Sequence, residues 1–313
     1  MDTNTGTYDV VIVGGGPAGL SAALVLGRAR RRVLVVDAGA PRNAPAAHMH
    51  GFLSRDATPP AELLGAARAE VCRYGVELVS DRVVDATVGF ALQLASGRAI
   101  QARHVLLATG AADELPEEID GARYRWGRDF LHCPYCHGWE VRDRPVCVLA
   151  TGPGSVEHAH LLRQWTDDVL LFTHTATVTD GERATLAARG IAVVDGTVER
   201  LVVEDDRLQA VQLADGRALT RDALFIRPAL RANPDNPAIL LGCEQRDDGL
   251  VHTSPDGRTS VPGVWAGGNA TNPRAQVITA AGEGSAVAIA INTELVRNDI
   301  AAADRLLAGA TAQ

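Results

Sequence analysis

The sequence predicts an α/β chain built from two Rossmann-like, three-layer dinucleotide-binding domains, the second inserted into the first. Three observations predict this fold. A strand, a glycine-rich turn and a helix occur near the start of the chain and again near its middle. Each of these openings is followed by a β-rich stretch that closes with an apolar strand. A third strand–turn–helix element, near the end of the chain, has no second copy.

The first opening is residues 10–19, VVIVGGGPAG, an apolar strand that runs into an alanine-rich helix. Gly14 permits the tight turn, Gly16 lets a pyrophosphate approach the backbone, and Gly19 allows close packing of helix on strand. The helix N-terminus favours phosphate charge, and Asp37 at the end of the next strand can accept a hydrogen bond from a ribose hydroxyl. This full context predicts a dinucleotide site rather than a glycine turn without a ligand.

The second opening is residues 146–155, VCVLATGPGS, and it is degraded. Ala150 and Ser155 replace the first and third glycines of the fingerprint. Thr173 stands where the first copy carries its acidic residue, and residues 173–179 contain no arginine that could receive a 2′-phosphate. The sequence therefore predicts that the nucleotide-binding fold persists here while NADPH binding is doubtful.

Both halves also carry a similar hairpin and closing strand. These are LASGRAIQARHVLLATG at 94–110 and LADGRALTRDALFIRP at 213–228. Ser96-Gly97 and Asp215-Gly216 are hairpin turn signals at matching places. Two domains of one ancestry explain the duplication.

The unduplicated stretch 261–296 predicts a strand, a glycine-rich turn and a long helix that complete the first domain. The predicted FAD-binding domain is therefore discontinuous, at residues 1–116 and 244–313. The inserted domain, at 117–243, resembles a degenerate NAD(P)H-binding domain and carries the Cys-x-x-Cys pair.

This C-terminal element indicates that the cofactor of the first domain is FAD. Gly268 and Asn269 can bring backbone and a side chain to the ribityl chain, and a helix from Gln276-Val277 would direct its positive end at the pyrimidine side of the flavin. Thr109-Gly110 offers a second close approach of the backbone. The candidate FAD contacts are Gly14, Gly16, Pro17, Ala18, Gly19, Asp37, Ala38, Arg42, His50, Val83, Thr109, Gly110, Gly268, Asn269, Gln276 and Val277.

Composition excludes several classes of function. The net charge of −8 argues against a nucleic-acid or anionic-membrane partner. All 30 basic residues are arginine, which excludes a Schiff-base or P-loop lysine. There is no apolar run of about eighteen residues to span a membrane. Residues 1–8 are polar and do not resemble a signal peptide, so we expect a cytoplasmic protein.

The candidate catalytic residues are Cys133, Cys136 and His137. A Cys-x-x-Cys pair at a helix N-terminus has a lowered thiol pKa, and Pro134 suits the first helical turn. His137, next to the pair, can hold or deliver the proton that thiol–disulfide exchange moves.

A structural zinc site is the alternative for this pair. It usually needs four ligands, and the chain has only one Cys-x-x-Cys, with His132 and His137 too close in sequence to complete a tetrahedron easily. Cys72, Cys147 and Cys243 are isolated, and we expect them to be small buried hydrophobic residues. No metal site is predicted.

Two further histidines lie in a predicted loop, HMHGFLSRD at 48–56. His48 and His50 could line a pocket over the flavin, or they could have no role. The sequence leaves both possibilities open.

The chain resembles the low-molecular-weight thioredoxin reductases over essentially its whole length. The shared motifs are GGGPAG, LLATGA, a mid-chain Cys-x-x-Cys, and VPGVWAGGN with AQVITAAGEG. CPYCHGWE, RNAPAAHMHGF and the degraded second fingerprint resemble a narrower branch, the flavin-dependent dithiol oxidases. Those enzymes close disulfides in microbial dithiol natural products such as gliotoxin and holomycin.

The resemblance implies roles for particular residues. Cys136 would face the flavin, Cys133 would exchange with the substrate, and His137 would replace the acidic proton donor of the reductases. Asn269 stands where reductases usually carry aspartate. The family is typically homodimeric, so a homodimer is expected.

The predicted function is that of an FAD-dependent thiol-disulfide oxidoreductase, a dithiol oxidase that uses Cys133 and Cys136 and passes electrons to O2. The main alternative is an NADPH-dependent thioredoxin reductase, followed by a ferredoxin-linked one. A non-catalytic flavin- or zinc-binding module is the alternative from another class. The sequence leaves open whether the substrate is a small-molecule dithiol or a thioredoxin-like protein.

Overall fold

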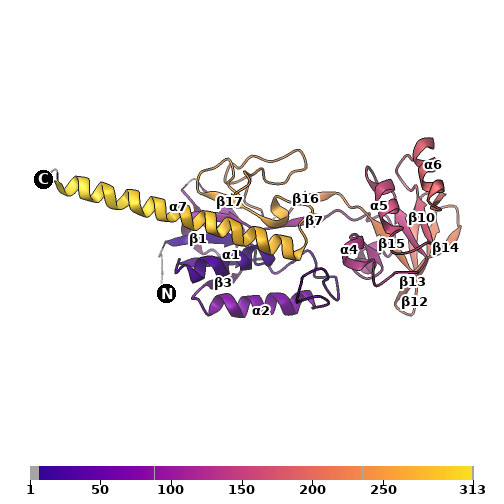
Figure 1. Cartoon of the computed structure of the whole chain (residues 1–313), viewed down its shortest axis with the longest axis horizontal. Helices are drawn as coiled ribbons and strands as arrows, with labels where there is room; N and C mark the ends of the chain where they lie inside the picture. The colour runs from indigo at the N-terminus through magenta and orange to yellow at the C-terminus, as the bar shows by residue number, and fades with distance from the viewer. Residues whose placement is uncertain (1–6, 88, 234–235, 312–313) are drawn as a thin grey trace. The chain divides into compact units, whose positions relative to one another are not determined.

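The computed structural model describes residues 7–87, 89–233 and 236–311 (Figure 1). Residues 1–6, part of the predicted polar N-terminus, lie outside the described residues. The chain forms two compact units, of which the first is Met1–Arg42, Ala61–Ala112 and Leu230–Gln313, and the second is Asn43–Pro60 and Asp113–Ala229. The predicted domain boundaries at 116/117 and 243/244 stay a prediction.

The first unit is built on a seven-stranded sheet. Its parallel part has β1 at the centre, between β2 and β6, and β17 pairs with β6 in parallel as well. β5 pairs with β6, and β4 pairs with β5, both in antiparallel orientation. The strands are β1 (Tyr8–Val13), β2 (Val33–Asp37), β3 (Glu77–Ser80), β4 (Val83–Ala86), β5 (Ala91–Leu94), β6 (Ala99–Leu107) and β17 (Val264–Ala266).

Helices cover this sheet, and α1 (Pro17–Arg28) and α7 (Val277–Thr311) pack on each other. Small residues make the close packing possible, because a Cβ on Gly284 would overlap the carbonyl of Ala18. The core between helices and sheet includes Leu26, Trp265 and Ile291, all fully buried. The remaining elements are α2 (Pro60–Cys72), the 3-10 turn η1 (Gly268–Ala270), and β7 (Ala111–Asp113) paired with β16 (Leu230–Ala232).

The strand order at the centre of the second unit's sheet repeats that of the first unit's sheet. β9 lies between β10 and β15, as β1 lies between β2 and β6, and all pairs are parallel. An antiparallel meander, β12 to β14, accompanies this sheet. The two-domain Rossmann-like fold predicted from the internal repeat is therefore confirmed. The strands are β8 (Phe130–Leu131), β9 (Val146–Leu149), β10 (Val169–Phe172), β11 (Ala192–Val194), β12 (Val198–Glu204), β13 (Arg207–Leu213), β14 (Ala218–Thr220) and β15 (Ala223–Ile226).

The helices of the second unit are short. They are α3 (Ala122–Arg125), α4 (Pro134–His137), α5 (Ser155–Leu162) and α6 (Asp180–Ala188). α6 begins with a capping box in which Thr179 and Glu182 satisfy each other's backbone N–H groups. The segment Asn43–Pro60 belongs to this unit, and Gly127 packs so closely on Pro45 that a Cβ would lie 2.8 Å from its carbonyl carbon.

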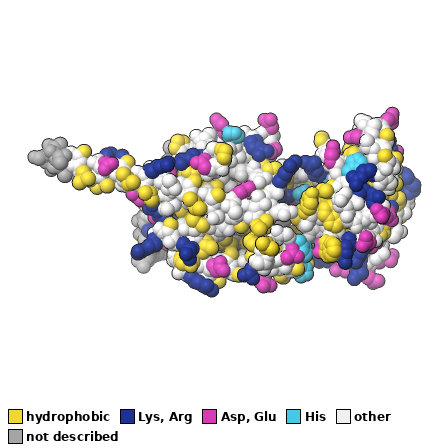
Figure 2. Space-filling view, in the orientation of Figure 1, with side chains coloured by type: hydrophobic (Ala, Val, Ile, Leu, Met, Phe, Trp, Pro, Cys, Tyr) yellow, Lys and Arg dark blue, Asp and Glu magenta, His cyan; other side chains and the backbone are white. Residues whose placement is uncertain are grey.

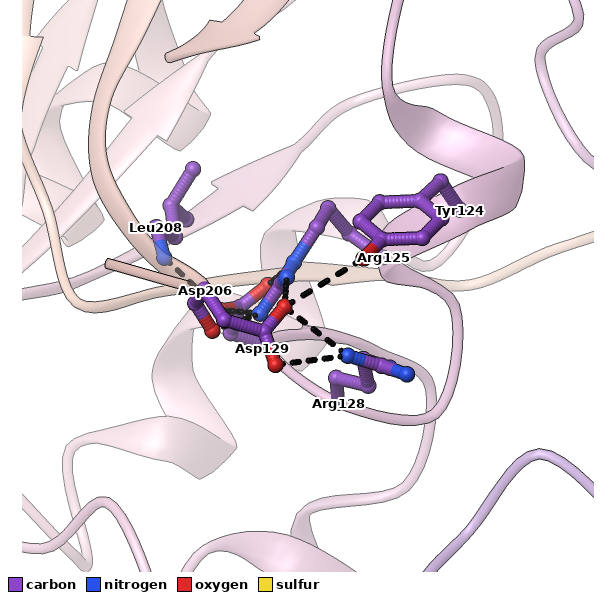
Figure 3. Close-up of polar contacts among 6 residues, drawn as sticks. All are labelled: Tyr124, Arg125, Arg128, Asp129, Asp206 and Leu208. Atoms are coloured by element: carbon purple, nitrogen blue, oxygen red, sulfur yellow. Dashed lines mark hydrogen bonds and ion pairs between the residues drawn. The ribbon is translucent and has the colours of Figure 1, made fainter. Parts of the chain in front are cut away.

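A buried ion pair fixes the strand that leads to the cysteines (Figure 3). The guanidinium of Arg125 is only 2% exposed and binds Asp129 with two hydrogen bonds, of 2.8 and 2.5 Å. It also reaches Asp206 at 2.7 Å, and these partners raise its pKa above the ordinary value. Asp129 in turn accepts from the backbone N–H of Leu208 and, through its carbonyl, from that of Leu224. Because Asp129 directly precedes β8, the pair ties β8 to β13 and β15.

Replacing Asp129 with alanine leaves the Arg125 guanidinium buried without its bidentate partner. We expect the free energy of unfolding of the second unit to fall by about 3–5 kcal/mol. Arg128→Ala is the matched control, because its ion pair with Asp206 is exposed and is worth about 1 kcal/mol or less. Urea unfolding followed by circular dichroism measures both. Equal losses in the two variants would contradict this account.

Candidate functional site

Cys133 and Cys136 are joined by a disulfide, with their Cα atoms 5.2 Å apart. Cys133 is the N-cap residue of α4 and Pro134 is its first residue, as the sequence predicts. The backbone N–H groups of Cys136 and His137 both donate to the carbonyl of Cys133, at 3.1 Å. The disulfide therefore spans the single turn of α4, which follows β8.

His137 lies half-buried at the end of that turn. Burial lowers its pKa, the Glu140 carboxylate opposes this shift, and His50 adds to the lowering. Nε2 of His50 is 3.4 Å from Glu140, and its Nδ1 is 3.4 Å from Asp56. His50 is therefore placed in the second unit with the cysteines, and its predicted contact with FAD stays a prediction. His48 is exposed.

His158 on α5 is a buried residue that the sequence analysis missed. Both of its ring nitrogens are buried and have no hydrogen-bond partner among the described residues. Burial, assisted by His132 and Arg227, lowers its pKa to about 4, so the ring is neutral at pH 7. It packs edge-on against Phe225, with 6.1 Å between ring centroids. The sequence pattern around His158 does not indicate that its imidazole is buried.

Two glycines of the first turn pack closely on the protein backbone, whereas the third lies beside open space. Gly14 has φ +111°, and a Cβ there would overlap the carbonyl of Ala108. A Cβ on Gly19 would overlap the carbonyl oxygen of Gly14. A Cβ on Gly16 would meet no described atom within 4 Å. The turn therefore keeps an open approach to its backbone at the N-cap of α1, which fits a pyrophosphate.

Two further observations fit a dinucleotide at this turn. The hydroxyl oxygen of Thr109 is buried at the end of β6 and has no hydrogen-bond partner among the described residues. A buried hydroxyl without a partner is uncommon and can be satisfied by a ligand. Asp37 accepts from Arg68 at 2.8 Å and from the Gly39 N–H at 3.1 Å, so its carboxylate is held in place at the end of β2. Arg68 was not anticipated, because only folding brings α2 beside β2.

The other predicted contacts lie in or just after four elements of the first unit. Pro17 and Ala18 form the first turn of α1, Ala38 and Arg42 follow β2, and Val83 lies in β4 with its side chain in the core. Gly110 adopts a left-handed conformation just after β6. The roles of these residues toward FAD stay predictions.

A polar network supports the turn that precedes α7. Asn269 donates its amide to the carbonyls of Asn272 and Ala275, at 2.9 and 3.0 Å. Glu283 accepts from the backbone N–H of Gly268 at 3.0 Å and from Asn272 at 2.7 Å. An ionised aspartate has no hydrogen to donate, so asparagine suits position 269 here. Glu283, from α7, was missed because its partners lie on a separate turn. α7 begins at Val277, as predicted.

Three polar side chains beside the second fingerprint are bound within the protein. Thr173 accepts from the backbone N–H of Gly196 at 3.3 Å. Arg183 donates to the Asp195 carboxylate at 2.5 Å, and Arg217 donates to the Asp195 carbonyl at 2.6 Å and to the Asp215 carboxylate at 2.8 Å. The arginines that folding brings here are thus already paired with an acidic residue.

Cys147 and Cys243 are buried, as predicted, and burial raises the pKa of each thiol. The prediction for Cys72 is wrong, because this residue ends α2 on an exposed face. Across the described parts of the chain, no three His, Cys, Asp or Glu side chains are grouped to hold a metal ion. Within the same residues, no helix combines the length and apolarity needed to cross a membrane.

A dinucleotide-binding turn and a Cys-x-x-Cys disulfide in one chain define a flavin–disulfide oxidoreductase. The chain belongs to the pyridine nucleotide-disulphide oxidoreductase family, whose profile matches residues 8–284. The predicted family and enzyme class are confirmed, and membership implies a flavin cofactor.

Among curated relatives, thioredoxin reductase tcpT of Claviceps purpurea is 35% identical over 280 residues, covering 83% of this chain and 86% of its own. Thioredoxin reductase sirT of Leptosphaeria maculans is 30% identical over 328 residues, covering 98% and 100%. The crystal structure of HlmI is similar with a TM-score of 0.94 and 53% identity, covering 98% of both chains. An oxidoreductase from Agrobacterium tumefaciens gives a TM-score of 0.87 and 38% identity, covering 93% and 99%.

Gly16→Ala tests the cofactor turn. The added methyl group meets no protein atom, so we expect unchanged folding stability but FAD binding weakened about tenfold or more, because the methyl group takes space needed by the pyrophosphate. Flavin fluorescence titration of the apoprotein measures the affinity. Gly65→Ala, on α2 and equally free of contacts, should bind FAD as the wild type does. Wild-type affinity in Gly16→Ala would place the phosphates elsewhere.

Proposed function

We propose that the protein is an FAD-dependent dithiol oxidase that forms a disulfide in a small dithiol and passes the electrons to O2. The observation that carries this proposal is a Cys133–Cys136 disulfide in a domain whose own dinucleotide fingerprint is degraded. Similarity to HlmI over nearly the whole chain supports a common chemistry.

The thiol chemistry follows from the disulfide. One substrate thiolate attacks Sγ of Cys133, forms a mixed disulfide and releases Cys136 as a thiolate. The second substrate thiolate then attacks the substrate sulfur of that mixed disulfide and releases Cys133. The substrate loses two electrons and two protons, and the protein gains a dithiol. A bound FAD would take up the electron pair, and O2 would carry it away as hydrogen peroxide.

His137 is the proposed proton carrier for this exchange. It adjoins Cys136 and has a lowered pKa, so its ring is largely neutral at pH 7 and able to accept a thiol proton. Glu140, three residues further on, stabilises the ring once it is protonated.

The main alternative is an NADPH-dependent thioredoxin reductase, which the names of tcpT and sirT favour. Against it stand the ion pair of Arg183 with Asp195, the ion pair of Arg217 with Asp215 and the hydrogen bond of Thr173 with Gly196. A 2′-phosphate would have to displace these carboxylates from the two arginines. We therefore infer that the second crevice serves as a scaffold and that electrons enter from the dithiol.

A homodimer through α7 is also proposed. Ile289, Val296, Ile300 and Leu307 lie on one exposed stripe and are 44–67% exposed. With Thr293 and Ala303 they repeat at alternating intervals of four and three residues, the pattern of a coiled-coil seam. Hydrophobic side chains can be followed along the protruding part of α7 in Figure 2.

The anchoring of α7 supports the same proposal. Asp299 holds the helix to the first unit through Arg31 and Arg103, at 2.9 and 2.5 Å. Beyond this point α7 continues to Thr311, and Figure 1 shows it extending past the sheet of its unit. A free helical segment of about twelve residues is only marginally stable in water. A second copy of the chain would cover its apolar stripe.

Cys136→Ser tests the electron path. The variant should keep its FAD, but the anaerobic bleaching of the flavin band by a small dithiol should slow by about 10³-fold or more, because the disulfide is lost. Cys72→Ser is the control for removing an exposed thiol and should behave as wild type. Normal bleaching in Cys136→Ser would refute the proposed path. Rapid bleaching of the wild type by NADPH would support the reductase instead.

Val296→Glu/Ile300→Glu tests the dimer. Two carboxylates on the stripe should shift the molar mass measured by light scattering from dimer to monomer. Asn298→Glu adds one carboxylate on the opposite side of α7 and should remain dimeric. A dimeric double variant would show that another surface makes the interface, and a monomeric wild type would end the proposal.

A further inference from the structure

Two large aromatic side chains occur in and just after the Cys-x-x-Cys segment and are open to solvent. Tyr135 and Trp139 are each 65% exposed. Among the described residues of the second unit, the only other large hydrophobic side chains exposed by more than a third are Leu53 and Tyr124. In Figure 2, hydrophobic side chains gather on the second unit around the position of α4. Two exposed rings of this size within five residues of the chain indicate a binding surface.

Local contacts hold both rings in fixed positions. Tyr135 meets Trp165 edge-on, with centroids 5.6 Å apart and planes at 85°. The guanidinium carbon of Arg142 lies 4.1 Å from the centre of the Trp139 ring, and Arg142 donates to the Trp139 carbonyl at 2.7 Å. Because these contacts already restrict the side chains, little conformational entropy remains to be lost when a ligand binds.

The support beneath the rings is equally close. A Cβ at Gly138 would lie 2.8 Å from the indole of Trp165, so Trp165 packs directly on the end of α4. The carbonyl of Trp165 accepts from the backbone N–H of Asp143 at 2.9 Å. Tyr135 on α4 and Trp139 just after it are therefore both supported by packed side chains, and we call the two rings the aromatic platform.

The size of the platform indicates what it binds. Two aromatic side chains can bury about 300–500 Å² in total. A stable protein partner needs about 800 Å² on each side, whereas a single unsaturated ring is covered well by two aromatic faces. The positive charge of Arg142 beside Trp139 suits a substrate that reacts as a thiolate.

We propose that Tyr135 and Trp139 are specificity-determining residues that stack on a flat, unsaturated ring of the dithiol substrate and so hold its sulfurs at the disulfide. This inference rests on the proposed dithiol oxidation. It assigns to these two side chains the preference for ring-bearing dithiols over acyclic dithiols and protein thiols.

The test uses the full-length, FAD-loaded protein and oxygen consumption with three probes. These are toluene-3,4-dithiol as a ring dithiol, dithiothreitol as an acyclic dithiol, and reduced thioredoxin as a protein dithiol. In Trp139→Ala and Tyr135→Ala, kcat/KM for toluene-3,4-dithiol should fall about tenfold or more through KM, and for dithiothreitol less than about twofold. Trp139→Phe and Tyr135→Phe should restore most of the preference.

Tyr124→Ala removes an equally exposed ring elsewhere on the second unit and is the matched control. Equal losses for both small dithiols, or no loss for either, would overturn the inference while leaving dithiol oxidation intact. A preference for thioredoxin that is lost in the alanine variants would also overturn it, by assigning the platform to a protein. A wild type that oxidises no dithiol would overturn the proposed function, and this inference with it.

Discussion

The contact between Arg125 and Asp129 determines where the disulfide lies in the second unit. A buried guanidinium needs paired acceptors, and Asp129 provides two while also accepting from Leu208 on the meander. Its carbonyl is bound to Leu224 on β15. The chain is therefore fixed on three sides before it reaches β8, and the cysteines follow β8 directly. The position of Cys133 is thus fixed by a charge pair that lies earlier in the chain, at Arg125 and Asp129.

Local patterns in the sequence predicted the parts of the fold that depend on local rules. The two strand–turn–helix openings, the hairpins at Gly97 and Gly216, and a Cys-x-x-Cys at the start of a helix follow from the spacing of glycine, proline and apolar residues. The positions that were missed depend on contacts between distant segments. Arg68 on α2 binds Asp37 at the end of β2, and Glu283 on α7 accepts from the backbone N–H of Gly268. Cys72 is exposed because it lies on the outward face of α2.

The two halves of the duplication have diverged in what their polar groups bind. In the first unit, Gly16 leaves open space and Thr109 has a buried hydroxyl without a partner among the described residues. In the second, Thr173 and the arginines beside Asp195 are bound within the protein. The two copies thus share a backbone order but differ in the partners of the polar side chains beside their glycine turns, which is the basis for proposing a ligand in the first copy and a scaffold in the second. The second unit still has a structural role, because β8 pairs with its strand β15 and α4 follows β8.

The segment Asn43–Pro60 has a consequence for the exchange of parts between related proteins. Although it is encoded within the first half of the chain, it packs on the second unit, where Pro45 meets Gly127 and His50 meets Glu140. A recombinant fragment of residues 113–229 would lack this piece of its own surface. A chimera that exchanges the second unit between homologues should therefore exchange Asn43–Pro60 and Asp113–Ala229 together. Recombination at a single crossover between these two segments would separate residues that contact each other.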